Sequence, residues 1–207
     1  MTSAVPETDA PATVPIDGRR LRREENARRL YDAATELFAT GSFDELSVDD
    51  ICEQAGVGRA TFFRIYDTKA GLLREFNRRL TADARSRLAA AETDDVRARL
   101  DIVRQTIVDA WSAAGTGHIG MAVEALRAGS SSGMHAPHPE LFDLVTEIIA
   151  DAVDRDELAA TVPVRLAASL AVVHLSSAVA YSLKRDEVDI DELSRTLLDQ
   201  WLRGMQP

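Results

Sequence analysis

Apolar residues recur at helical spacing through most of the chain, beginning just after an arginine-rich run near the N-terminus. The first set occupies one helix face and consists of Leu30, Ala33, Ala34, Leu37 and Phe38. Gly41 suits a left-handed cap, so this helix is expected to end there. A second, narrower stripe consists of Val48, Ile51, Cys52 and Ala55. Ser47 is expected to start that short helix as its N-cap, and Gly56 is expected to stop it.

Further helices are predicted downstream of this pair. A short helix runs from about Arg59 to Tyr66, and a long one begins near Lys69. The remaining periodic stretches predict long helices near 94–113, 119–128, 139–153, 163–185 and 189–203. No stretch alternates as a β-strand does, so the predicted fold class is all-α. Residues 1–17 are rich in Pro, Thr and Ala without periodicity, which is typical of a disordered tail.

The two short helices meet at Gly56-Val57-Gly58, and this tight turn predicts a helix-turn-helix. In such a unit the second helix enters the DNA major groove. Arginine can hold guanine by two hydrogen bonds, an aromatic ring can contact thymine methyl groups, and helix N-termini favour phosphate. The predicted DNA contacts are Ser47, Gly58, Arg59, Ala60, Thr61, Phe63, Arg64 and Lys69.

Charge is divided unevenly along the chain. The net charge of −10 alone argues against a nucleic-acid partner. However, residues 19–87 carry 14 Lys and Arg against 12 Asp and Glu, whereas residues 88–207 carry 10 against 19. Only the local potential matters at a DNA surface, so the acidic remainder is compatible with DNA binding.

Other classes of protein find little support in the sequence. No apolar run reaches the roughly 18–20 residues that span a bilayer, and no signal peptide is recognisable, so a cytoplasmic protein without a membrane partner is expected. No phosphate loop, nucleophile elbow, zinc spacing or apolar carboxylate pair indicates an enzyme or a cofactor. His135 and His138 flank Pro137 without a nearby cysteine, so no metal site is expected.

The N-terminal region resembles the DNA-binding domain of TetR-family (tetracycline-repressor-like) transcriptional regulators. The resembling segments are AAxELFAxGSF at 33–43, SVDDI at 47–51, AGVGRATFFRIY at 55–66 and TKAGLL at 68–73. Three positions depart from the family's usual residues. Gly58 stands where Ser or Thr is common, Phe63 where Tyr is common, and Cys52 where Ala is common. The first two changes remove particular phosphate contacts.

With residues 1–18 taken as the disordered tail, the resemblance implies a helix-turn-helix domain at 19–68 and a helical effector and dimer domain at 69–207. It implies a homodimer through the helices near 163–185 and 189–203, and the nearly all-apolar 163–183 segment independently requires burial on several sides. The family's small-molecule pocket would be lined by Trp111, His118, Met121, Glu124, Leu126, Phe142, Val145, Ile149 and His174. Low aromatic content favours a lipophilic ligand.

Several alternatives stay open on sequence grounds. The arginines from Arg19 to Arg23 either form a minor-groove arm or start a solvated helix. The pocket residues either bind a ligand or are ordinary core. The chain is either a ligand-released repressor of a near-palindromic operator, a DNA-binding regulator without a ligand, or a helical interaction module that has lost DNA binding. Buried packing, rather than redox sensing, is expected of Cys52.

Overall fold

The computed structural model describes residues 18–114, 120, 139–159, 161–182, 185 and 187–206. Within them the helices are α1 (Gly18–Thr40), α2 (Val48–Ala55), α3 (Arg59–Tyr66), a 3-10 turn η1 (Lys69–Gly71), α4 (Leu72–Ala91), α5 (Val96–Ser112), α7 (Pro139–Asp154), α8 (Val164–Ser182) and α9 (Ile190–Gly204). This part of the chain contains no strand, and the predicted all-α class is confirmed.

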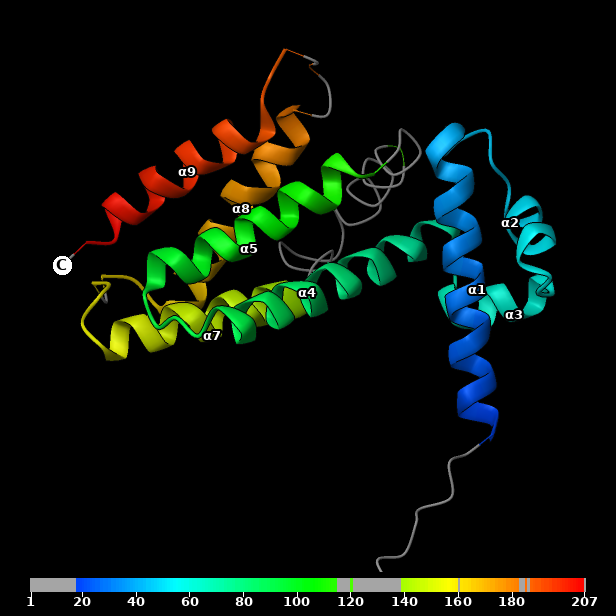
Figure 1. Ribbon diagram of the computed structural model, residues 1–207, viewed down its shortest axis with the longest axis horizontal. Coiled ribbons are helices and arrows are strands. Elements are labelled where there is room, and N and C mark those ends of the chain that lie inside the picture. The colour runs from blue at the N-terminus through cyan, green and yellow to red at the C-terminus, as the bar shows by residue number, and fades with distance from the viewer. Residues whose placement is uncertain are drawn as a thin grey trace, which may run out of the picture.

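The helices form an elongated molecule with two ends (Figure 1). The first three helices pack together at one end, and α4 leads from them into a helical body made of α5, α7, α8 and α9. The chain order therefore places the predicted helix-turn-helix at one tip of the molecule.

Predicted and observed helices agree closely, with differences at the starts of α1 and α4. α3 has the predicted bounds. α1 begins at Gly18, so the arginines from Arg19 to Arg23 lie inside a helix and not in an extended segment. A 3-10 turn occupies residues 69–71, so the long helix begins at Leu72 rather than Lys69. The predicted tail and all but Gly120 of the predicted 119–128 helix lie outside the described residues.

Local hydrogen bonds explain why α2 starts and stops where it does. Ser47 Oγ accepts from the Asp50 backbone N–H at 3.1 Å, and the Asp50 carboxylate accepts from the Ser47 N–H at 2.8 Å, which completes a capping box. Hydrogen bonds to the carboxylate from the Ser47 hydroxyl and from the Ser47 N–H lower the pKa of Asp50. At the other end Gly56 has φ 60° and ψ 39°, and a Cβ there would lie 2.8 Å from Arg29 Nη2. Glycine is therefore the residue that this turn requires.

Buried aromatic residues fix α3 against α1. Phe62 is 0% exposed and its ring centroid lies 5.4 Å from that of Tyr66. The Tyr66 hydroxyl donates to the Ala27 carbonyl at 2.7 Å, and burial raises the pKa of this phenol. Because one side of α3 is held in this way, its opposite side is turned outward.

The body is held partly by a buried arginine. Arg104 on α5 is 0% exposed, and its guanidinium donates to Asp101 at 2.6 Å, to the Asp191 carboxylate at 2.6 Å and to Ser194 at 3.1 Å. The hydrogen bond from Arg104 holds the pKa of Asp191 below its usual range. Since Asp191 and Ser194 belong to α9, this cluster fixes α9 against α5.

One helix corrects an expectation about membranes. The sequence was expected to contain no apolar run long enough to span a bilayer. By length and composition alone α8 is long and apolar enough, with a mean hydropathy of 1.4 over 18 residues. A core helix passes the same test, and 44% of this 18-residue window is buried inside the molecule. α8 packs against α7 and α9, so its apolar character is accounted for in part by this packing.

Candidate nucleic-acid interface

The outward side of α3 carries most of the residues that the sequence predicted to contact DNA. Gly58, Arg59, Ala60, Phe63 and Arg64 are exposed, while Thr61 is half-buried. The neighbouring Phe62 is fully buried, whereas Phe63 is 38% exposed. Their rings meet nearly edge to face, at 80° with centroids 5.5 Å apart. The buried ring thereby supports the exposed one.

The Arg59 guanidinium contacts two neighbouring side chains on this surface. Its Nη1 donates to the carboxylate of Asp49 on α2, and its guanidinium carbon lies 5.2 Å from the Phe63 ring centroid. Arg64, one turn along α3, has no ion-pair partner in the part of the chain that the structure describes. Sequence reasoning missed Asp49, because no motif signals a contact ten residues away across the turn.

The N-cap residues of the two short helices have different surroundings. Ser47 is exposed, and its hydroxyl donates to the Asp50 carboxylate at 2.7 Å while it caps α2. Gly58 is the N-cap of α3 without a side-chain cap, and no atom would lie within 4 Å of a Cβ built there. Space is therefore open at Gly58 for a nearby phosphate or for a larger side chain.

Lys69 is turned toward the protein. Its ammonium donates to the carbonyl of Phe43 and, at 2.8 Å, to that of Leu46, and it lies 4.0 Å from the Phe43 ring centroid. It thus ties the start of the long α4 segment to the loop between α1 and α2. The phosphate contact remains a prediction, and this second, structural role was not foreseen.

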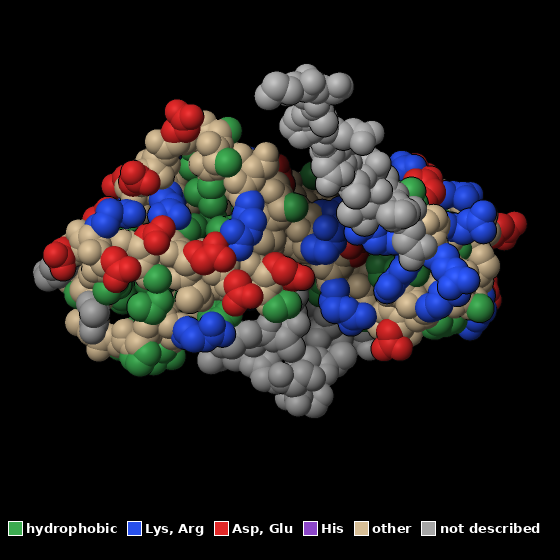
Figure 2. Space-filling view, turned by 90° about the horizontal axis from the view of Figure 1, so that it is seen from below, with side chains coloured by type: hydrophobic (Ala, Val, Ile, Leu, Met, Phe, Trp, Pro, Cys, Tyr) green, Lys and Arg blue, Asp and Glu red, His purple; other side chains and the backbone are tan. Residues whose placement is uncertain are grey.

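Basic side chains gather over this end of the molecule, whereas acidic side chains are interspersed over the body (Figure 2). Beside α3, a cleft of about 500 Å³ is lined by charges of both signs: Arg20, Arg23, Arg74 and Arg78, together with Glu24, Glu75 and Glu140. Arg78 pairs with Glu75 at 2.7 Å, and Arg74 donates to the Tyr66 carbonyl at 3.0 Å. Arg20 and Arg23 are therefore carried by α1 beside a cleft of mixed charge, and Arg20 is paired with Glu24.

The predicted pocket residues are only partly described. Trp111, Phe142, Val145 and Ile149 are buried in one core, and the rings of Trp111 and Phe76 lie 4.9 Å apart. His174 is half-buried on α8, with Nδ1 2.6 Å from the Leu170 carbonyl of its own helix. His118, Met121, Glu124 and Leu126 lie outside the described residues, as do His135 and His138.

Residues 30–76 match the family model described as "Bacterial regulatory proteins, tetR family". One curated relative, the candidate mycofactocin biosynthesis transcriptional regulator MftR of Mycobacterium tuberculosis, is 46% identical over 48 residues. That match spans 23% of this chain and 24% of the relative. The strongest sequence likeness is thus confined to the helix-turn-helix end.

Solved structures extend the likeness to the whole fold. A TetR transcription regulator from Haloarcula marismortui has a TM-score of 0.63 at 15% identity, covering 89% of this chain and 100% of that one. The regulator FadR of Bacillus subtilis, solved with stearoyl-CoA, has a TM-score of 0.56 at 17% identity, covering 86% and 99%. At these identities the likeness concerns the fold.

Proposed function

We propose that this chain, whose residues 30–76 match the tetR family of bacterial regulatory proteins, is a cytoplasmic DNA-binding transcriptional regulator. DNA binding is assigned to residues 19–68, and effector binding and dimerisation to residues 69–207. The observation that carries the proposal is the outward face of α3, where Arg59, Phe63 and Arg64 are exposed beside a buried Phe62.

That face has the chemistry of a major-groove reader. The exposed guanidinium groups of Arg59 and Arg64 can donate in pairs to guanine, and the Phe63 ring can contact a thymine methyl group. Gly58 and Ala60 carry little or no side chain, so the backbone at the start of α3 can approach the bases. Ser47 and Lys69 are proposed to add phosphate contacts, which set the register of the helix on the duplex.

A homodimer would place two such faces on one operator. Four apolar residues of α8, namely Leu166, Leu170, Val173 and Tyr181, are 38 to 49% exposed. The first three follow the i, i+4, i+7 spacing of one helix face, and an exposed apolar face of this kind favours a protein partner. Together with the half-buried Leu193 and Leu197 of α9, this face supports a two-fold interface, and hence a near-palindromic operator.

The regulator is proposed to act as a repressor that a small lipophilic ligand releases. Support comes from the apolar core around Trp111, Phe142, Val145 and Ile149, and from the stearoyl-CoA complex of a protein with the same fold. The ligand would favour a dimer whose two α3 helices are wrongly spaced for the operator. Its effect is limited to the difference in its affinity for the two states.

The test is a selection of bound duplexes from a random pool, run beside binding of the DNA upstream of the protein's own gene. The proposal predicts a recurring two-fold symmetric motif, and affinity for it that falls steeply as salt rises because phosphate contacts release counterions. Enrichment of no motif, with weak binding to all duplexes, would contradict it and favour an interaction module.

A further inference from the structure

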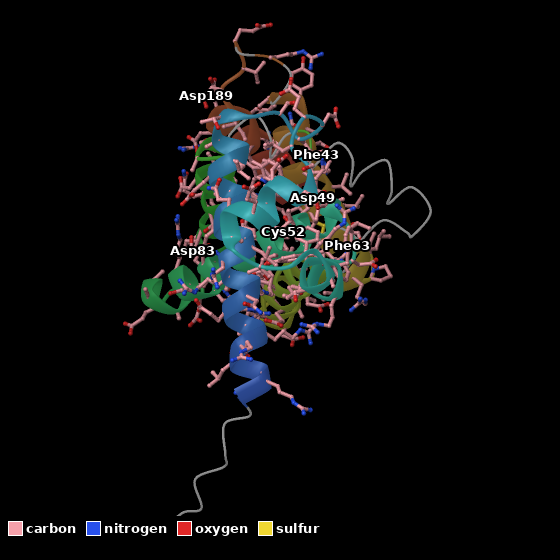
Figure 3. The ribbon with its side chains drawn as sticks, turned by 90° about the vertical axis from the view of Figure 1, so that its right-hand side faces the viewer. Phe43, Asp49, Cys52, Phe63, Asp83 and Asp189 are labelled. Atoms are coloured by element: carbon pink, nitrogen blue, oxygen red, sulfur yellow. The ribbon has the colours of Figure 1, made fainter. Side chains whose placement is uncertain are left out.

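An acidic side chain stands on the proposed DNA-binding face. Asp49 is an exposed residue in the first turn of α2, and Asp49 and Phe63 lie on the same end of the molecule, from α2 and α3 respectively (Figure 3). A carboxylate there repels the phosphate backbone, so its presence weakens binding to every sequence alike. Attraction to phosphate therefore does not explain why an acidic residue, Asp49, lies on this face.

The geometry around Arg59 supplies a different role. The Asp49 carboxylate accepts from Nη1 of Arg59, while the Phe63 ring faces the same guanidinium with a centroid distance of 5.2 Å. Two contacts from different helices thus fix the plane of a side chain that is 58% exposed. Within the described part of the chain, the Nε and Nη2 groups of Arg59 have no acceptor.

The Nε–Nη2 edge of Arg59 matches the hydrogen-bond acceptors of guanine. Nε–H and Nη2–H project in parallel from one side of a guanidinium, and guanine offers two acceptors, O6 and N7, with the same spacing in the major groove. A long arginine side chain in water samples many rotamers, and ordering it on binding costs free energy. A carboxylate that orders it beforehand lowers this cost only for the duplex that has guanine at that position.

We propose that Asp49 is a positioning residue that presents the Nε–Nη2 edge of Arg59 to a guanine in each half-site. This inference rests on the proposed function and names how one base of the operator is read. Asp49 then has two opposed effects: it lowers the affinity for all DNA through its charge, and it raises the discrimination at one base pair. The pair is solvent-exposed, so it contributes little to folding stability.

The experiment compares the full-length protein with Asp49→Asn, Arg59→Ala and the control Glu53→Gln. Glu53 lies one turn further along α2, is exposed, and makes no contact with Arg59. Both Asp49→Asn and Glu53→Gln remove one negative charge from α2. For each protein, affinities are measured for the selected duplex and for duplexes changed one base pair at a time, and thermal unfolding is recorded to check the fold.

The wild type should show one guanine position per half-site at which Arg59→Ala abolishes discrimination. Asp49→Asn should lower discrimination at that position alone, on the order of tenfold, and should bind the mismatched duplex more tightly than the wild type does. Glu53→Gln should raise affinity for all duplexes by a similar factor and leave the discrimination unchanged.

Two results would overturn the inference while leaving the proposed function intact. In one, Asp49→Asn behaves as Glu53→Gln does, which means that Asp49 acts through its charge alone. In the other, Arg59→Ala leaves every position equally well discriminated, which means that Arg59 reads no base. A wild-type protein that selects no motif would instead overturn the proposed function, and this inference with it.

Discussion

The two ends of the molecule differ in where their distinctive side chains lie. At the helix-turn-helix end the helices α2 and α3 have only eight residues each, and the arginines of α3 are exposed. In the body the helices have 15 to 19 residues, Arg104 is wholly buried, and apolar residues of α8 are exposed. The helix-turn-helix end thus exposes arginines on α3, whereas the body also exposes an apolar face on α8.

This difference indicates two kinds of partner. Exposed guanidinium groups beside backbone without bulky side chains suit a polyanion, whereas an exposed apolar helix face suits a second protein surface. The acidic body, with 19 Asp and Glu against 10 Lys and Arg in residues 88–207, keeps its own surface away from DNA. Each of the following substitutions changes one end of the molecule. Its effects on DNA binding and on folding or dimer mass are measured together.

The largest effect is expected from a charge in the α8 face. Leu170→Arg should separate the dimer, because an arginine would have to be buried without a partner in the proposed interface. Loss of the second half-site contact should then lower operator affinity by about 10² to 10⁴-fold. Ala90→Arg, at an exposed position of α4, is the control. Light scattering gives the mass, and an unchanged dimer mass for Leu170→Arg would contradict the proposed interface.

The next effect comes from the recognition face itself. Arg59→Ala and Arg64→Ala should each weaken operator binding by about 10 to 100-fold, the usual value of a base contact made by arginine. Dimer mass and thermal unfolding should not change, because both side chains are exposed. Arg97→Ala removes an arginine from an exposed ion pair of the body and should leave DNA binding as it was. Normal binding by either α3 variant would remove that residue from the contact set.

Lys69 tests whether one residue serves both folding stability and DNA binding at the helix-turn-helix end. Loss of its hydrogen bonds to the Phe43 and Leu46 carbonyls should lower the free energy of unfolding by about 1.5–3 kcal/mol in Lys69→Ala. A phosphate contact should in addition weaken binding to all sequences alike and reduce the salt slope by about one. Thermal unfolding and salt titrations separate the two. Reduced stability with an unchanged salt slope would leave only the structural role.

The smallest effect is expected at Gly58. Nothing lies within 4 Å of a Cβ at this N-cap, so Gly58→Ser should fit without strain and gain a few tenths of a kcal/mol as a better helix cap. The new hydroxyl should also raise DNA affinity a few-fold through a phosphate contact. Gly56→Ala is the contrasting variant, since φ is 60° there, and it should destabilise the domain. Equal stability of the two variants would contradict the assignment of these turns.

The helix-turn-helix end was readable from sequence because its signals are local. The Ser47–Asp50 capping box, the left-handed Gly56 and the alternation of buried Phe62 with exposed Phe63 each depend on residues a few positions apart. Their spacing therefore predicts the α3 bounds and its outward face. Contacts between residues ten or more positions apart are not local in this sense. The Asp49–Arg59 ion pair and the hydrogen bonds from Lys69 to the Phe43 and Leu46 carbonyls were therefore not predicted.

The body was predictable in outline only. Periodicity gives the bounds of α5, α7, α8 and α9 within about three residues, but no pattern in the sequence indicates that Arg104 would be buried against α9. Long-range packing decides such contacts. The same limit applies to the pocket: burial of Trp111, Phe142, Val145 and Ile149 follows from hydrophobicity, whereas their ligand remains a prediction.

The most direct test of the account is a titration of the purified protein with its selected duplex and with a scrambled duplex of the same composition, at several salt concentrations, with the mass of each complex measured. The account predicts two protomers on one selected duplex and a much weaker, more salt-sensitive association with the scrambled one. Equal affinity for the two duplexes, or binding by a single protomer, would contradict it.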